Sequence, residues 1–211
     1  MTLYRLLDAV GFRPVMKALY RIELTGAERI PAEGLAILAA NHESLIDPFV
    51  LGTVTTRRIR YLAKAELWRN PLLARVMDAF GTFPVERGTG DSAALGRAAR
   101  LLAEGEILGI FPQGTCLPYR RRPYMRGAAR LALATGAPLV PVRMVGTERA
   151  LRPGRFRIGL PKIRILVGEP IRVGPERPTV ASARALTAAL EAMIAELGRP
   201  YGEPRHAWRP A

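Results

Sequence analysis

Residues 35–48 of the sequence, LAILAANHESLIDP, place an apolar run directly before a polar turn and a proline. Leu35–Ala40 is typical of a short buried strand, and Leu45–Val54 is long enough for a helix behind it. A strand followed by a helix is the unit from which parallel sheets are built. The stretch therefore predicts an α/β fold, with its polar residues at the carboxyl end of a strand, where ligand sites of such sheets collect.

The rest of the chain repeats this alternation of strand and helix. Strands that are separated by helix-length patterns are typical of α/β proteins with a parallel or mixed sheet. We therefore expect a single α/β domain with a mixed, largely parallel sheet flanked by helices, preceded by an N-terminal amphipathic helical pair. The further strands that we expect are Ile59–Ala63, Thr82–Val85, Ile107–Phe111, Leu139–Val145 and Ile163–Val167.

Helix boundaries are marked by capping and stop residues. Asn70 and Pro71 read as the N-cap and first residue of a helix that Gly81 stops, and Asp91 caps a helix that ends before Gly105. Further helices are expected around Gly127–Thr135 and before Gly198 and Pro200. The apolar faces are Leu73, Val76, Met77 and Phe80 in the first helix, Leu95, Ala98, Ala99 and Leu102 in the second, and Leu186, Leu190, Met193, Ile194 and Leu197 in the last.

The 211 residues are enough for one domain with short extensions. Residues 1–24 carry apolar residues at helical spacing with basic residues between them, interrupted by Pro14. These helices either pack on the core of the protein or dip into a membrane interface. We expect residues 25–198 to form the main domain and residues 199–211 to form a tail rich in proline and arginine.

The charge and the metal-ligating residues limit the possible partners. Lys and Arg number 32 against 18 Asp and Glu, a net charge of +14, which favours nucleic acid, an anionic membrane or phosphate-bearing substrates. A single cysteine and two histidines exclude an internal disulfide framework and Cys- or His-rich metal sites, so no metal is expected. Because no apolar run reaches the roughly 20 residues that span a bilayer, we expect a cytoplasmic protein with a possible role at the membrane surface.

His42 and Asp47 form the candidate catalytic pair. A neutral imidazole can remove a proton from a hydroxyl group if a carboxylate fixes its tautomer and stabilises the imidazolium. The pair is the His–Asp half of a serine-protease triad, so the nucleophile would be the hydroxyl of a substrate. The alternative is structural: the histidine caps the end of a strand and the aspartate caps the next helix.

Four ordered blocks of sequence resemble one known family. Asn41-His42-x4-Asp47-Pro48 is similar to the first motif of the glycerolipid acyltransferases, the family of 1-acyl-sn-glycerol-3-phosphate acyltransferases. The later blocks follow in the order of the family's motifs, and the resemblance covers roughly residues 20–197. They are Gly81–Gly88, Phe111–Thr115 and Ala137–Val142, followed by a late strand and turn at Ile163–Ile171.

The resemblance implies a reaction without an acyl-enzyme. His42 would be the general base and Asp47 its orienting partner, and the deprotonated acceptor hydroxyl would attack the thioester of an acyl-CoA or acyl-carrier protein. No cofactor is implied beyond this co-substrate. The acceptor would be a lysophospholipid, foremost 1-acyl-sn-glycerol-3-phosphate, which gives phosphatidic acid.

The resemblance also assigns the binding residues. Arg87, with Gly88 beside it, would hold the phosphate of the acceptor. The alternative is that Arg87 is a solvated arginine of a loop. Gln113, Gly114 and Thr115 would shape the acceptor site, in which Gln113 would align the acceptor hydroxyl. We place Asn41 and Pro141 on the acyl-donor side. The cluster Arg120, Arg121 and Arg122 either binds coenzyme A phosphates, an acidic carrier protein or anionic lipid headgroups, or is a solvated loop.

Two residues depart from the family pattern. The family has glutamate where this chain has Gln113, which keeps one acceptor oxygen but replaces the charge by an NH2 donor. The acceptor is therefore either a lysophosphatidate or a different lysolipid, sugar, amine or natural-product hydroxyl. Cys116 stands where arginine or another polar residue is common; it is either a small filler or an acyl-accepting thiol.

A nucleic-acid-binding protein is the distant alternative, suggested by the charge alone. Basic stretches interleaved with aromatic residues, a helix-turn-helix pattern and an RNP-like motif are all missing from the sequence. We therefore expect lipid partners, an anionic membrane surface and peripheral association with the inner face of the cell membrane. Acyl chain length, the choice between CoA and carrier protein, and the oligomeric state do not follow from any motif.

Overall fold

The computed structural model describes residues 11–79, 81–85, 92–116, 123–151 and 158–202. These residues form one sheet of seven strands in the order β1-β7-β6-β2-β5-β3-β4. Among the described strands β6 and β7 pair antiparallel and all other neighbours pair parallel, which confirms the expected mixed, largely parallel sheet. The strands are β1 (Glu23–Thr25), β2 (Ala36–Ala40), β3 (Ile59–Lys64), β4 (Phe83–Val85), β5 (Ile107–Ile110), β6 (Leu139–Val145) and β7 (Arg164–Val167).

β2 lies in the middle of the sheet and carries no polar side chain. All five of its residues are buried, because β5 pairs with one of its edges, β6 pairs with the other, and both of its faces are covered. β2, β5 and β3 run parallel, so their carboxyl ends meet at one edge of the sheet. The loop after β2, which contains His42, therefore lies beside the loop after β5, which contains Gln113.

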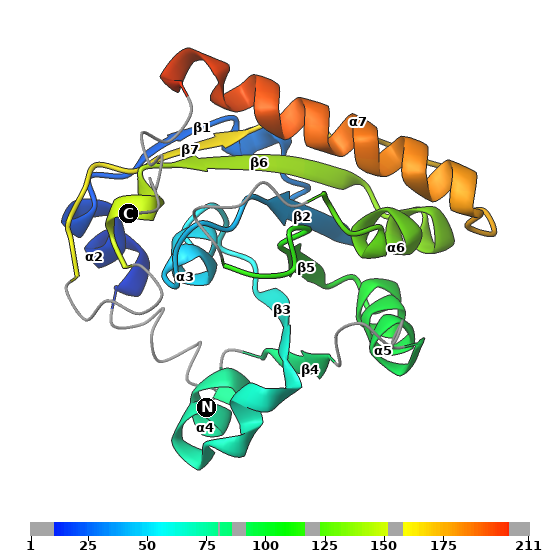
Figure 1. Ribbon diagram of the computed structural model, residues 1–211, viewed down its shortest axis with the longest axis horizontal. Coiled ribbons are helices and arrows are strands. Elements are labelled where there is room, and N and C mark those ends of the chain that lie inside the picture. Colours follow the sequence, from blue (N-terminus) through cyan, green and yellow to red (C-terminus); the bar gives the residue numbers. More distant parts are fainter. Residues whose placement is uncertain (1–10, 80, 86–91, 117–122, 152–157, 203–211) are drawn as a thin grey trace, which may run out of the picture.

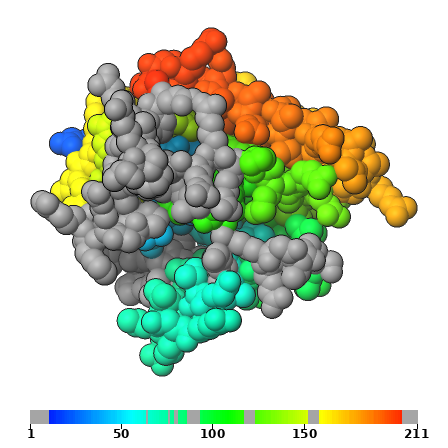
Figure 2. Space-filling model, viewed as in Figure 1, coloured from blue at the N-terminus to red at the C-terminus, as the bar shows by residue number. Residues whose placement is uncertain are grey.

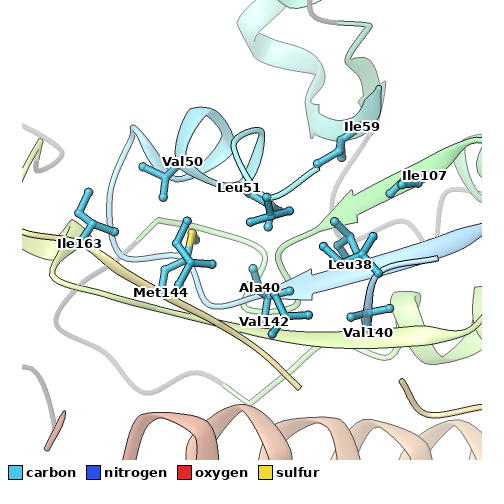
Figure 3. Close-up of a cluster of buried hydrophobic side chains, with 14 of the residues drawn as sticks. Leu38, Ala40, Val50, Leu51, Ile59, Ile107, Val140, Val142, Met144 and Ile163 are labelled. Carbon is cyan, nitrogen blue, oxygen red and sulfur yellow. The ribbon is translucent and has the colours of Figure 1, made fainter. Parts of the chain in front are cut away.

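Helices cover both faces of the sheet, as expected for this fold class (Figure 1). One apolar cluster joins one face of the sheet to α3 (Asp47–Leu51) and to Met16 of α2 (Phe12–Leu19). In Figure 3, Leu51 of α3 lies over Ala40 of β2, and Val50 of α3 lies over Met144 of β6. The second cluster joins the opposite face to α5 (Ser92–Ala103), α6 (Gly127–Thr135) and α7 (Val180–Gly198).

α4 (Pro71–Ala79) begins and ends where the sequence predicts. Asn70 Oδ1 accepts hydrogen bonds from the backbone N–H groups of Leu72 and Leu73 at 2.9 and 3.2 Å, and Gly81 has a positive φ of 67°. The expected apolar face is not buried at Leu73, whose exposed fraction is 42%. The reason is that α4 packs against the 3-10 helix η2 (Ala65–Arg69), and these two segments project from the body of the molecule (Figure 2).

The N-terminal region is part core and part surface. α2 starts at Phe12 behind Gly11 and includes Pro14, while residues 1–10, where the first helix of the pair is expected, lie outside the described residues. Met16 packs against the core, but Val15 and Leu19 are exposed. β1 was not expected; it runs across the boundary that we placed at residue 24 and pairs with β7. No described helix is long and apolar enough to cross a bilayer.

Candidate active site

The loop between β2 and α3 is anchored at its first residue. The Asn41 side-chain oxygen accepts a hydrogen bond from the Met144 backbone N–H at 2.7 Å, and the Asn41 side-chain nitrogen donates to the Met144 carbonyl at 2.9 Å. The amide thus continues the pairing of β2 with β6 by one further residue, using side-chain atoms in place of backbone. This fixes the point from which the next residue, His42, leaves the sheet.

His42 and Asp47 are brought together by the turn into α3. The Nδ1 of His42 lies 2.9 Å from Oδ2 of Asp47, whose side chain is completely buried. The same oxygen accepts the backbone N–H groups of Glu43 at 2.7 Å and Ser44 at 2.8 Å. The Asp47 carboxylate therefore binds backbone groups of the loop before α3 as well as the His42 ring.

This geometry determines which ring nitrogen of His42 can act as a base. An ionised carboxylate only accepts hydrogen bonds, so Nδ1 donates to Asp47 and the neutral ring keeps its lone pair on Nε2. The His42 ring stacks on Phe111, with 4.3 Å between ring centroids, and its side chain remains 15% exposed. The imidazole is therefore held by a hydrogen bond and a flat contact while solvent or substrate can still reach it.

Phe111 extends this contact to a second aromatic residue. Its ring is stacked on Tyr61 with 6.3 Å between centroids, and the Tyr61 hydroxyl donates to the carbonyl of Pro48 at 2.8 Å. Gly109 is required under this ring, because a β-carbon there would collide with Tyr61. The row of aromatic rings thus links β3 and β5 to the start of α3. Phe111 belongs to the third sequence block, but the motifs do not indicate Tyr61 or Gly109, or the stacking of Phe111, because these contacts form between neighbouring strands.

Gln113 contacts the backbone of His42. The Gln113 Oε1 accepts a hydrogen bond from the His42 backbone N–H at 2.5 Å. A backbone N–H can only donate, so this contact assigns the two ends of the amide, with the oxygen toward His42 and the NH2 group turned the other way. The sequence suggests that Gln113 aligns an acceptor hydroxyl; in the structure its oxygen is engaged by the loop that carries His42.

The turn after β5 brings the rest of the third motif to this edge. Gly114 has a positive φ of 72°, and its backbone N–H donates to the carbonyl of Phe111 at 2.9 Å. Thr115 and Cys116 follow and are half-buried. Burial, with smaller contributions from the negative charges of Asp47 and Glu43, raises the pKa of the Cys116 thiol to about 12. The thiol is therefore protonated at neutral pH, which opposes its use as an acyl acceptor.

A buried polar group behind the loop is not indicated by the motifs. The side chain of Glu43 accepts a hydrogen bond from Asn41 at 3.2 Å, and the same oxygen lies 3.5 Å from Arg143 Nη1. Burial raises the pKa of the Glu43 carboxyl, and the negative charges of Glu148 and Asp47 add to this effect. Ser44 completes the anchoring, because its hydroxyl donates to the carbonyl of Leu151 at 2.7 Å.

The remaining sequence-based site residues lie elsewhere or outside the described structure. Pro141 is buried in β6, its carbonyl accepts the Gly168 N–H at 2.8 Å, and its ring lies close to Gly168. Successive side chains of a strand point to opposite faces of the sheet. Pro141 therefore lies on the same face as Leu139, and Val140 and Val142 lie on the other face. Arg87, Gly88, Arg120, Arg121 and Arg122 fall outside the described residues.

A metal site is not suggested by the part of the chain that the structure describes. Among these residues no group of three or more His, Cys, Asp or Glu side chains could hold a metal ion. The arrangement around His42 instead holds one oriented and partly exposed imidazole. Such a site suits proton abstraction from a hydroxyl group.

Comparison with known proteins identifies the family. The family model described as Acyltransferase matches residues 21–145, a range that contains β1 to β6 and both loops of the candidate site. The chain belongs to the acyltransferase family. A 1-acyl-sn-glycerol-3-phosphate acyltransferase of Bacillus subtilis is 31% identical to this acyltransferase over 179 residues, which cover 83% of this chain and 87% of the relative.

Other relatives agree with this assignment. A protein of the same name from Borreliella burgdorferi is 32% identical over 131 residues, covering 61% of this acyltransferase and 52% of the relative. The crystal structure of the 1-acyl-sn-glycerophosphate acyltransferase of Thermotoga maritima superposes with a TM-score of 0.72 and covers 92% of this chain and 81% of its own. At 20% identity this likeness confirms the fold.

Proposed function

We propose that this acyltransferase moves a fatty acyl group from an acyl thioester to the free hydroxyl of a lysophospholipid. The preferred acceptor is 1-acyl-sn-glycerol-3-phosphate, which becomes phosphatidic acid, and the donor is acyl-CoA or an acyl-carrier protein. The names of the bacterial relatives support this acceptor. The observation that carries the proposal is the 2.9 Å contact between His42 Nδ1 and the buried carboxylate of Asp47.

The chemistry needs one base and no protein nucleophile. His42 Nε2 takes the proton of the acceptor hydroxyl as its oxygen attacks the thioester carbonyl, forming a tetrahedral intermediate. Collapse of this intermediate breaks the C–S bond, and the imidazolium returns the proton to the departing thiolate. Asp47 stabilises the imidazolium and holds the ring in the productive tautomer. No acyl group is carried by the protein, which agrees with the protonated state of the Cys116 thiol.

Gln113 supports a second candidate acceptor. Its oxygen is engaged by the His42 backbone, so the group it can offer a substrate is an NH2 donor. A group that donates a hydrogen bond favours an acyl acceptor with an oxygen lone pair beside its reacting hydroxyl. The same reaction on another lysolipid, or on a sugar, amine or natural-product hydroxyl, is therefore the alternative.

We further propose that the enzyme binds the inner face of the cell membrane peripherally. Val15 and Leu19 lie four residues apart on α2 and are 58% and 45% exposed, with Lys17 exposed between them. Apolar side chains beside a cationic group suit an anionic interface, where a lysolipid resides. We also propose that Arg87 binds the phosphate of the acceptor. Arg120, Arg121 and Arg122 would bind the acyl donor or lipid headgroups.

The test is a product assay with purified protein. Acyl-CoAs and acyl-carrier proteins of several chain lengths are incubated with a panel of lysolipids, and the products are identified by mass spectrometry. We expect phosphatidic acid from lysophosphatidate and a loss of product in the His42→Ala variant, with unchanged circular dichroism. Acylation by His42→Ala at the wild-type rate, or no acylation of any lysolipid by the wild type, would refute the proposed function.

A further inference from the structure

We propose that Gln113 is a positioning residue for the catalytic base. It would hold the backbone of His42 through its side-chain oxygen, and as a neutral amide it would keep a further negative charge away from the imidazole. This inference rests on the proposed function. It goes beyond that function in assigning to the residue at position 113 an effect on the base, in addition to the NH2 group that it offers a substrate.

Hydrogen bonds to its backbone show how tightly the loop is held. Residues 42, 43 and 44 present three successive N–H groups, and each is bound by a side-chain oxygen. Asp47, at the start of α3, binds the second and third, while Gln113, beyond the end of β5, binds the first. Asp47 therefore fixes the ring and the far side of the turn. Gln113 fixes the backbone from which the ring projects.

This division predicts what the Gln113 bond contributes. Without it, the His42 N–H loses its acceptor, and residue 42 can shift relative to β5. The ring is held by two contacts, to Asp47 Oδ2 and to Phe111 of the same β5 loop. A shift of the backbone disturbs the alignment of Nε2 toward a substrate even if the bond to Asp47 survives, and misalignment lowers the rate of the chemical step.

Buried charges around the loop show why neutrality at position 113 is significant. Three carboxyl groups, those of Asp47, Glu43 and Glu148, are buried here with exposed fractions of 0%, 7% and 2%. Arg143 lies 3.5 Å from Glu43, and Arg149 lies 3.3 Å from Glu148. These groups come from α3, the catalytic loop, β6 and the 3-10 helix η3 (Thr147–Arg149).

Two further titratable groups near the loop, Cys116 and Tyr124, add no negative charge. Burial raises the pKa of Cys116 and of Tyr124 to about 12 each, and Tyr61 is a phenol hydrogen-bonded to the Pro48 carbonyl. A carboxylate at position 113, hydrogen-bonded to the His42 N–H, would therefore add a fourth acidic group to the three buried around the loop. It would favour the protonated imidazole, which cannot act as a base.

Two variants of similar size separate the two effects. Gln113→Met removes the acceptor oxygen without adding charge, and we expect kcat to fall about tenfold with little change in the KM of the acyl donor. Gln113→Glu keeps an acceptor oxygen and adds a charge. We expect its kcat to approach the wild-type value at high pH, but the acid limb of its pH–rate profile to move up by about one pH unit.

A spectroscopic measurement tests the inference without turnover. The chain has two histidines, so a His206→Gln background leaves His42 as the single imidazole for NMR titration. We expect the His42 titration midpoint to rise by about one pH unit in Gln113→Glu and to stay within a few tenths of a unit in Gln113→Met. In Gln113→Met we expect the ring signals to broaden or to change position as the ring becomes mobile.

The outcomes distinguish this inference from the proposed function. Wild-type kcat together with unchanged ring signals in Gln113→Met would overturn the positioning role. A His42 titration in Gln113→Glu identical to that of the parent would overturn the electrostatic role. If the wild type acylates no lysolipid while both NMR effects appear, the proposed function fails and the inference about Gln113 stands. Circular dichroism and thermal unfolding of each variant confirm that the fold is retained.

Discussion

His42 and Asp47 act as one unit, so their replacement has unequal effects. We expect His42→Ala to abolish acyl transfer, because no other described side chain occupies the position of the base. Asp47→Asn keeps the volume but presents an NH2 group or a neutral oxygen to the ring, which disturbs the tautomer and removes the stabilising charge. We expect it to lower kcat by about 10³- to 10⁴-fold in an acyl-transfer assay.

A matched control for this pair is Asp78→Asn. Asp78 is an exposed carboxylate on α4 whose Oδ1 accepts the Trp68 indole N–H at 2.9 Å, far in sequence from the loop. The same chemical change there leaves kcat at the wild-type value if the effect at Asp47 is specific. An Asp47→Asn variant with full activity would show that His42 does not depend on its carboxylate.

Cys116 illustrates how the surroundings of a side chain determine its reactivity. Because its thiol has a pKa of about 12, only about one molecule in 10⁴ carries a thiolate at pH 8, far less than a free cysteine. We expect iodoacetamide to alkylate Cys116 at pH 8 at least a hundredfold more slowly than a cysteine peptide, as followed by mass spectrometry. Cys116→Ala should retain most of the acyl-transfer activity; loss of activity together with fast alkylation would restore the thiol as an acyl acceptor.

At the scale of elements, α2 has two faces with different environments. Met16 lies against the core, and the guanidinium of Arg13 donates to the Thr55 carbonyl at 2.8 Å, so the helix is attached to the domain. Val15 and Leu19 face outward. α2 thus has a contact with the core and an exposed apolar face. The membrane contact stays a prediction.

The membrane contact of α2 can be tested by placing negative charges on its exposed apolar face. We expect Val15→Asp combined with Leu19→Asp to weaken binding to phosphatidylglycerol vesicles by at least about tenfold, because two apolar side chains no longer enter the interface and the new charges are repelled. Vesicle flotation measures the bound fraction. The control is Val180→Asp, which is 66% exposed on α7 in the wild type and should leave binding unchanged. Equal binding of all three proteins would remove α2 from the interface.

At the scale of the whole molecule, the carboxyl and amino ends of the strands differ in function. The carboxyl edge carries the loop of His42. At the amino edge, the guanidinium of Arg57 donates to the carbonyls of Pro31 at 2.8 Å, Gly34 at 2.5 Å and Gly105 at 2.6 Å. It thereby joins the segments that lead into β2, β3 and β5. Stability and chemistry are thus expected to be separable.

Arg57→Met tests this separation. The variant keeps much of the aliphatic stem and loses three bonds from a charged donor, so we expect the free energy of unfolding to fall by about 2–4 kcal/mol. Urea denaturation measures this loss, and kcat below the unfolding range should stay within about twofold of the wild type. A large loss of kcat with unchanged stability would show that the amino edge influences the base.

Much of the architecture follows from local sequence. The bounds of α6 and β6 agree with the predicted segments, because helix periodicity, an apolar run and the glycine that follows the helix are all encoded within a few residues. β1 and the exposed face of α4 are not predicted from the sequence. Glu23–Thr25 is short and partly polar, and it follows a segment with helical spacing. Burial of a helix face depends on what the rest of the chain brings to it.

The sequence by itself determined the α/β class, the place of the loop at the end of β2, and the pairing of His42 with Asp47, which are five residues apart. Only the tertiary structure decided that Gln113 binds the His42 backbone, that Phe111 stacks on the ring and that Glu43 meets Arg143. The physical reason is separation along the chain. Contacts within one turn are dictated by local geometry, whereas contacts between residues about 70 to 100 positions apart exist only after β2, β5 and β6 have paired.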